Sequence, residues 1–71
     1  MATIHDRLVA ALQKRGAQRP PNSRVSRYTV LQLPGQADFY FVGRAGALRR
    51  GKTTATSIPA DTTKARLLAE T

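Results

Sequence analysis

Cysteine and tryptophan are absent from the 71 residues, and histidine occurs once. The lack of cysteine excludes disulfides and thiolate metal sites, and it suits a reducing compartment. No apolar run approaches the roughly 20 residues that a membrane span requires. The chain does not open with a charged segment followed by an apolar run, as a secretory signal would. We therefore expect a cytoplasmic protein with no membrane span.

Groups that could perform chemistry are also few. The four carboxylates, Asp6, Asp38, Asp61 and Glu70, are scattered along the chain, and Asp6 and Asp61 occupy helix-capping positions. His5 is the only imidazole. Neither a carboxylate pair nor a nucleophile with an oriented base can be assembled from these residues. The sequence therefore predicts a protein that is not an enzyme and that holds no cofactor and no metal.

Positive charge is the most prominent feature of the composition. Twelve Lys and Arg residues against four acidic residues give a formal net charge of +8, and most of the twelve are arginine. The arginine fork binds phosphate and carboxylate groups in a bidentate manner more readily than lysine does. Such a surface attracts polyanions, so the expected partner is a nucleic acid or an acidic protein surface.

Hydrophobic periodicity predicts one α+β domain over residues 1–71, built as a helix, a three-stranded antiparallel meander and a second helix. Thr3 and Asp61 are the expected N-caps of the two helices. A proline-containing stretch over 16–26 fits neither helix nor strand, and we expect it to be a flexible basic connector within the domain. The expected elements are a helix over 3–15, strands over 27–33, 38–42 and 47–54, and a helix over 62–70.

The expected core consists of six apolar residues: Leu8, Leu12, Leu31, Phe39, Phe41 and Leu68. Because side chains alternate along a strand, Phe39 and Phe41 share one face and Tyr40 shares the other with Val42. The helices should cover one face of the sheet, and the sequence does not say which. Tyr28 and Tyr40 are candidates for stacking on bases, as aromatic side chains do in single-strand binders.

Residues 46–53, Gly-Ala-Leu-Arg-Arg-Gly-Lys-Thr, match the phosphate-loop pattern GxxxxGK[ST]. That motif works at the N-terminus of a helix, where backbone N–H groups surround the phosphates. Here the following residues are largely β-branched and lead to Pro59, which opposes a helix. We therefore interpret the segment as a basic hairpin that does not hydrolyse nucleotides.

The candidate contact residues fall into two groups. The first is a hairpin cluster flanked by glycines, which let the backbone approach a partner closely: Arg44, Arg49, Arg50 and Lys52. The second is an electrostatic patch of Lys14, Arg15, Arg19, Arg24 and Arg27. Since strand neighbours alternate, either Arg49 or Arg50 must lie on the helix-covered side, at its rim or beside an acid. The alternative interpretation of the cluster is a run of solvated charges.

Residues 54–58, Thr-Ala-Thr-Ser-Ile, are followed by Asp61, Lys64 and the run 68–70, Leu-Ala-Glu. This pattern resembles the hairpin-to-helix segment of the small head–tail joining proteins of lambda-like bacteriophages. The resemblance covers about seventeen residues, and it implies the same order of helix, antiparallel strands and helix. It also implies a role in virion assembly.

Two functions follow as hypotheses. The leading one is a small basic binding module, encoded by a phage or prophage, that contacts nucleic acid through the arginine-rich hairpin. The alternative is a structural protein of the phage virion, of the head–tail joining type, which packs as a homo-oligomer against acidic protein neighbours. In that case the protein would reside in the virion.

Overall fold

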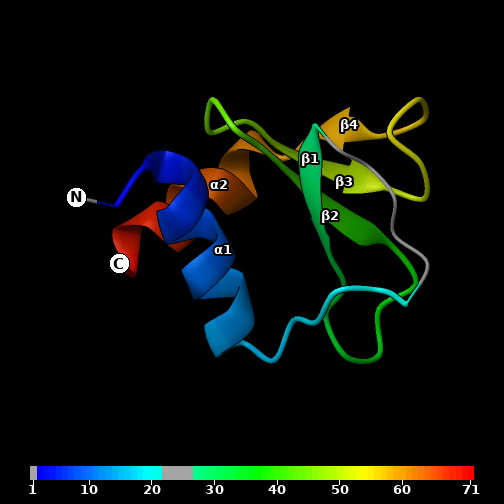
Figure 1. The fold of residues 1–71 in the computed structure, drawn as a ribbon, viewed down its shortest axis with the longest axis horizontal. Helices are drawn as coiled ribbons and strands as arrows, with labels where there is room; N and C mark the ends of the chain where they lie inside the picture. The colour runs from blue at the N-terminus through cyan, green and yellow to red at the C-terminus, as the bar shows by residue number, and fades with distance from the viewer. Residues whose placement is uncertain (1, 22–26) are drawn as a thin grey trace.

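The computed structural model describes residues 2–21 and 27–71, which form two helices and a four-stranded antiparallel sheet (Figure 1). The elements, in chain order, are α1 (Ile4–Lys14), β1 (Tyr28–Leu31), β2 (Phe39–Gly43), β3 (Leu48–Gly51), β4 (Ile58–Pro59) and α2 (Asp61–Ala69). The strands lie in the spatial order β1-β2-β3-β4, and both helices lie on the same side of the sheet. The predicted α+β class is confirmed, but the sheet has one strand more than expected. Neither helix in this part of the chain is long and apolar enough to cross a membrane.

Helix α1 begins after the predicted N-cap, Thr3, which forms a capping box with Asp6. The Oγ1 atom of Thr3 accepts a hydrogen bond from the Asp6 backbone N–H at 3.1 Å, and the Asp6 carboxylate accepts one from the Thr3 N–H at 3.4 Å. Two orphan donors of the first turn are thereby satisfied. Hydrogen bonds from His5 and from Thr3 hold the pKa of the Asp6 carboxyl below its usual value. The helix ends before Gly16, whose φ of +91° suits a glycine at this position.

Strand β4 is the element that the sequence did not predict. Arg49 pairs with Pro59 and Arg50 pairs with Ile58, so the chain returns along β3 after a short loop. Pro59 lies in this edge strand, and the N–H that proline lacks would point outward rather than toward β3.

The third strand is shorter than predicted, because the chain turns back after Gly51 rather than after Thr54. A Cβ atom at Gly51 would lie 2.7 Å from the Cα atom of Ser57, so only glycine allows this approach. The prediction that Asp61 is the N-cap of α2 is also wrong. Ala60 is the N-cap of α2 and makes no side-chain cap hydrogen bond, and Asp61 is the first helical residue.

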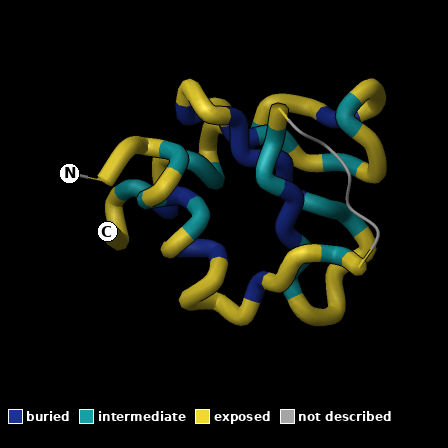
Figure 2. The backbone as a smooth tube through the Cα atoms, viewed as in Figure 1, coloured by how far each residue is buried: buried dark blue, intermediate teal, exposed yellow. Residues whose placement is uncertain are grey.

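The core lies where the two helices meet the sheet (Figure 2). Its buried residues are Leu8, Ala11, Leu12, Ala17, Leu31, Tyr40, Val42, Leu48 and Leu67. The helices therefore cover the sheet face that bears Tyr40 and Val42. Burial of apolar side chains at this junction, between elements far apart in the sequence, is the main source of stability in a domain of this size.

The prediction of a core position is wrong for two residues, Leu68 and Phe39. Leu68 is only half-buried, and its neighbour Leu67, 1% exposed, occupies the core position of α2. Phe39 is half-buried and lies on the sheet face that the helices do not cover. Phe41 lies on the same face as Phe39. Unlike Phe39, Phe41 is buried, with 3% of its surface exposed. Leu8, Leu12, Leu31 and Phe41 are confirmed as buried core residues.

The first part of the expected flexible connector is anchored. Gln18 and Gln32 form an isolated antiparallel bridge, with N···O distances of 3.0 and 2.8 Å. Ala17 beside this bridge is buried in the core. Residues 22–26, the second half of the expected connector, lie outside the described residues.

Candidate nucleic-acid interface

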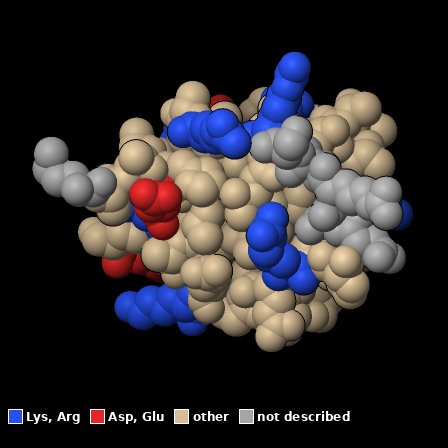
Figure 3. Space-filling view, viewed as in Figure 1, with Lys and Arg blue, Asp and Glu red and all other residues tan. Residues whose placement is uncertain are grey.

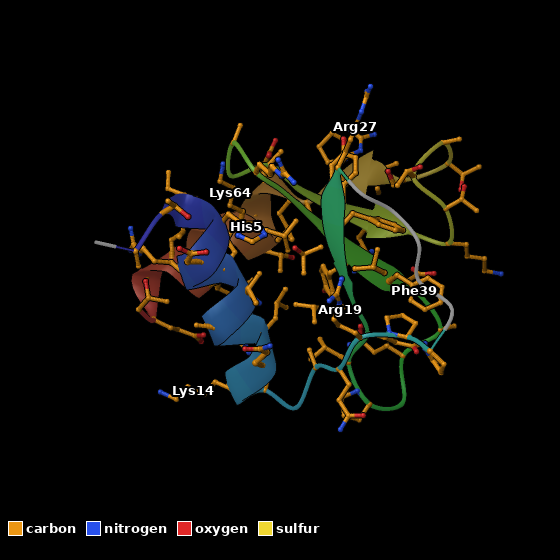
Figure 4. The ribbon with its side chains drawn as sticks, viewed as in Figure 1. His5, Lys14, Arg19, Arg27, Phe39 and Lys64 are labelled. Atoms are coloured by element: carbon orange, nitrogen blue, oxygen red, sulfur yellow. The ribbon has the colours of Figure 1, made fainter. Side chains whose placement is uncertain are left out.

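The sheet face away from the helices carries most of the aromatic side chains. We call it the aromatic face and define it by Tyr28, Val30, Phe39, Phe41 and Arg49. The strand register places them together, because Val30 pairs with Phe41 and Phe41 pairs with Arg49 across β1, β2 and β3. Figure 4 shows Phe39 on the side of the sheet opposite α1.

Three aromatic rings pack edge to face on this surface. The Phe41 ring is central, with its centroid 6.3 Å from that of Tyr28 and 6.5 Å from that of Phe39. Phe41 is buried, whereas Tyr28 and Phe39 are half-buried. The two outer rings are therefore the ones that can offer part of a π-surface to a partner, as single-strand binders require.

The expectation that Tyr40 could stack on bases is wrong. Tyr40 is 5% exposed and belongs to the core beneath the helices. Phe39 takes its place as a candidate, and the sequence assigned Phe39 to the core instead. No sequence signal separates the two, because both faces of β2 are apolar and the choice of covered face depends on the helices.

Arg49 is held in place by the loop that follows β3. Its Nε donates to the Ser57 hydroxyl at 2.8 Å, and its Nη2 donates to the Ser57 carbonyl at 2.6 Å. The Ser57 hydroxyl in turn donates to the Thr54 carbonyl at 2.8 Å. These bonds use two of the N–H groups of a guanidinium that has five. The remaining donors are pre-positioned on a half-buried side chain rather than on a freely rotating one.

Arg50 points to the other side of the sheet. It is exposed, and its Nε lies 3.9 Å from a carboxylate oxygen of Asp38. The prediction that either Arg49 or Arg50 would lie on the helix-covered side, at the rim or beside an acid, is confirmed. The hairpin cluster is therefore divided between the two faces of the sheet.

Arg27 and Arg44 lie at the same end of the sheet. Tyr28 pairs with Gly43, so the next residues outward on the two strands are Arg27 and Arg44. Both are exposed, and Figure 4 shows Arg27 extending away from the fold. Lys52 is exposed just beyond the opposite end of β3. Basic residues therefore frame the aromatic face at both ends, and Arg27 belongs with the hairpin residues rather than with the second patch.

The remaining described residues of the second patch lie apart from Arg27, at and after the C-terminal end of α1. Lys14 is exposed at the C-terminal end of α1, far from Arg27 in Figure 4. Arg15 forms an ion pair with Glu70. Arg19 is exposed in the segment that follows α1. Arg24 lies outside the described residues.

The four carboxylates of the chain lie away from the aromatic face. Asp6 belongs to α1, Asp61 to α2, and Glu70 is the C-cap of α2. Asp38 precedes β2 and faces Arg50 on the helix-covered side. Figure 3 shows the acidic side chains mainly at left, over the helices, with basic side chains beside them and across the rest of the visible surface. The aromatic face bears Arg49 and no carboxylate, so its charge favours an anionic partner.

The segment that matches the phosphate-loop pattern lacks the helix that the motif needs. After Lys52 the chain forms a turn, in which Thr53 Oγ1 lies 2.8 Å from Thr56 Oγ1, and then continues into β4. The predicted hairpin context is confirmed. Across residues 2–21 and 27–71, no three His, Cys, Asp or Glu side chains gather in a way that could hold a metal ion.

Comparison of the chain with protein-family models, with curated proteins and with solved structures finds no match. The resemblance to head–tail joining proteins therefore stays a prediction. The function has to be inferred from the geometry and charge of the site itself.

Proposed function

We propose that the protein is a non-enzymatic module that binds nucleic acid along the aromatic face. One observation carries the proposal: half-buried Tyr28 and Phe39 lie between exposed basic residues at the two ends of a sheet face that bears no carboxylate. Neither feature alone would suffice, because single exposed aromatics and solvated charges are common on protein surfaces.

The two kinds of side chain would make different contacts. The guanidinium groups of Arg27 and Arg44 match phosphate oxygens with paired N–H donors, and Lys52 adds a mobile point charge. Tyr28 and Phe39 would stack against bases, a contact that tolerates any sequence because every base has a π-face. Bases inside a duplex are already stacked, so this surface favours single strands.

The environment of His5, the only imidazole, supports binding without catalysis. Its Nε2 lies 2.8 Å from the Thr29 hydroxyl, and its Nδ1 lies 3.2 Å from the Asp6 carboxylate. His5 therefore links α1 to β1 through Nε2, and its Nδ1 is engaged by Asp6 on the same helix. A general base needs a ring nitrogen that can reach a substrate proton.

The test is fluorescence anisotropy with a labelled single-stranded oligonucleotide, titrated over a range of salt concentrations. Affinity should fall with salt by a log–log slope of about −0.7 for each phosphate contacted. The double variant Arg27→Gln/Arg44→Gln should flatten that slope by up to about 1.4. The control Lys14→Gln/Lys64→Gln removes the same charge from the two helices and should leave the slope nearly unchanged.

Two results would contradict the proposal: binding no tighter than millimolar at low salt, or equal losses in the two double variants. The first would show that nucleic acid is not the partner. The second would show a general attraction to positive charge, without a site on the aromatic face.

The alternative is the phage assembly function, and one observation favours it. Ile58 on the edge strand β4 is 58% exposed, and an unpaired sheet edge with an exposed apolar side chain is suited to pairing with another chain. Light scattering of the protein alone separates the two functions. The binding module should be a monomer or dimer, whereas an assembly subunit should form a large ring.

A further inference from the structure

Three arginines from three different elements meet at one pocket on the helix-covered side of the sheet. Arg15 follows α1, Arg50 belongs to β3 and Arg66 belongs to α2. The pocket has a volume of about 340 Å³. It lies on the side of the sheet opposite Tyr28 and Phe39, so it is separate from the proposed nucleic-acid surface.

None of the described residues that line this pocket is acidic. Glu70 forms an ion pair with Arg15, and a carboxylate oxygen of Asp38 lies 3.9 Å from Nε of Arg50. Neither Glu70 nor Asp38 lines the pocket. They can orient these two guanidinium groups without occupying the pocket. Arg66 adds a third cation. Three cations that line one small pocket, with no acid in the lining, favour an anion in it.

The rest of the lining determines what kind of anion fits. The buried side chains of Leu12, Tyr40 and Leu67 form apolar walls, and Thr63 contributes a hydroxyl. The volume is at the lower end of the range for small-molecule sites, roughly 300–1,000 Å³. Such a pocket suits one compact ligand with an anionic head and a small apolar body.

We propose that this pocket binds the phosphate monoester or diphosphate group of a small ligand. The guanidinium fork matches the oxygens of a terminal phosphate, and three forks can surround a group that carries two or more negative charges. The same chemistry is available from a small organic phosphate or from the phosphorylated end of a nucleic-acid strand. The proposal does not depend on the nucleic-acid surface of the aromatic face.

The test is a calorimetric titration of the full chain with inorganic pyrophosphate at constant ionic strength. Binding should be saturable with one site per chain. Arg66→Gln should weaken the affinity by about tenfold or more, the loss expected for one charge-assisted hydrogen bond. Arg66→Lys, which keeps the charge but not the fork, should lie between the two. Arg66 is exposed, so these variants should fold, and circular dichroism checks this.

The matched control is Arg19→Gln, which removes one positive charge from an exposed residue outside both this pocket and the aromatic face and should leave pyrophosphate binding unchanged. Equal weakening by Arg19→Gln and Arg66→Gln, or binding that does not saturate, would overturn the proposal. Competition then identifies the source of the phosphate. Displacement by a 5′-phosphorylated oligonucleotide, but not by its unphosphorylated form, supports a strand end. Displacement by glycerol phosphate alone supports a small organic phosphate.

Discussion

The two faces of the sheet use apolar side chains in different ways. On the helix-covered face, Tyr40, Val42 and Leu48 are at most 5% exposed and pack against leucines of α1 and α2. On the aromatic face, Val30 and Phe41 are also buried, but the outer rings of Tyr28 and Phe39 are only half-buried. Both faces therefore contribute to the stability of the fold, and the second also retains apolar surface that a partner can contact.

The arginines of β3 show the same difference between the faces. Arg50, on the helix-covered side, lies near Asp38 at the mouth of a pocket. Arg49, on the aromatic face, is hydrogen-bonded to Ser57 and has no carboxylate beside it among the described residues. Two adjacent residues with the same charge therefore have different surroundings, and substitutions should affect them differently.

The largest expected effect concerns the helix-covered face. Leu67→Ala should lower the free energy of unfolding by about 2–5 kcal/mol, because it leaves a cavity between α2 and the sheet. A domain of this size has a total stability of roughly 5–10 kcal/mol. The variant should therefore be close to unfolding at room temperature, as urea denaturation followed by circular dichroism would show.

Leu68→Ala is the matched control on the neighbouring residue, which is only half-buried. It removes the same atoms and should cost less than half as much as Leu67→Ala. If Leu68→Ala proved the more destabilising of the two, the face of α2 that meets the sheet would be assigned incorrectly.

The sequence predicted the element types well, because these depend on local periodicity and capping. Thr3 is the N-cap of α1 as expected, and the alternating pattern of β1 and β2 produces strands. The choice of covered face could not be predicted in the same way. Phe39 and Phe41 on one side of β2 are as apolar as Tyr40 and Val42 on the other, and only tertiary packing distinguishes them.

The candidate site was only partly predictable, for a similar reason. Its basic residues are visible in the sequence, but their grouping depends on strand register. Arg27 lies beside Arg44 because Tyr28 pairs with Gly43, a pairing between residues 15 positions apart. Strand β4 is only two residues long and contains a proline, so its own sequence carries no strand signal. Its pairing with β3 exists because Gly51 and Ser57 approach closely.

A second prediction sharpens the contrast between helix-covered and uncovered parts of the sheet. Gly46, in the turn between β2 and β3, has a φ of +94°, and a Cβ atom there would lie 2.7 Å from Cγ2 of Ile4. Gly46→Ala should cost roughly 2–3 kcal/mol in unfolding free energy, because the left-handed backbone and the steric clash both oppose alanine.

Gly35, in the turn between β1 and β2, is the matched control. It also has a positive φ, +76°, but a Cβ atom there meets nothing within 4 Å. Gly35→Ala should cost only about 1–2 kcal/mol, from the backbone alone. Ile4→Ala should reduce the cost of Gly46→Ala toward that of Gly35→Ala. Equal costs at the two glycines in the natural background would mean that α1 does not pack over the β2–β3 turn.

The smallest expected effect concerns the aromatic face and tests whether Arg49 contributes to the fold. Ser57→Ala removes the hydroxyl that accepts from Nε of Arg49 but keeps the carbonyl that accepts from Nη2. A double-mutant cycle of Arg49→Ala with Ser57→Ala should give a coupling free energy of about 0.5–1.5 kcal/mol, the usual net value of one hydrogen bond. Urea denaturation of the four proteins measures it. Arg44→Ala paired with Ser57→Ala should show no coupling, because Arg44 follows β2 at the end of the sheet opposite to Gly51 and Ser57. A coupling near zero for Arg49 as well would mean that its guanidinium is not held by the loop, and it would then be as mobile as the other basic residues of this face.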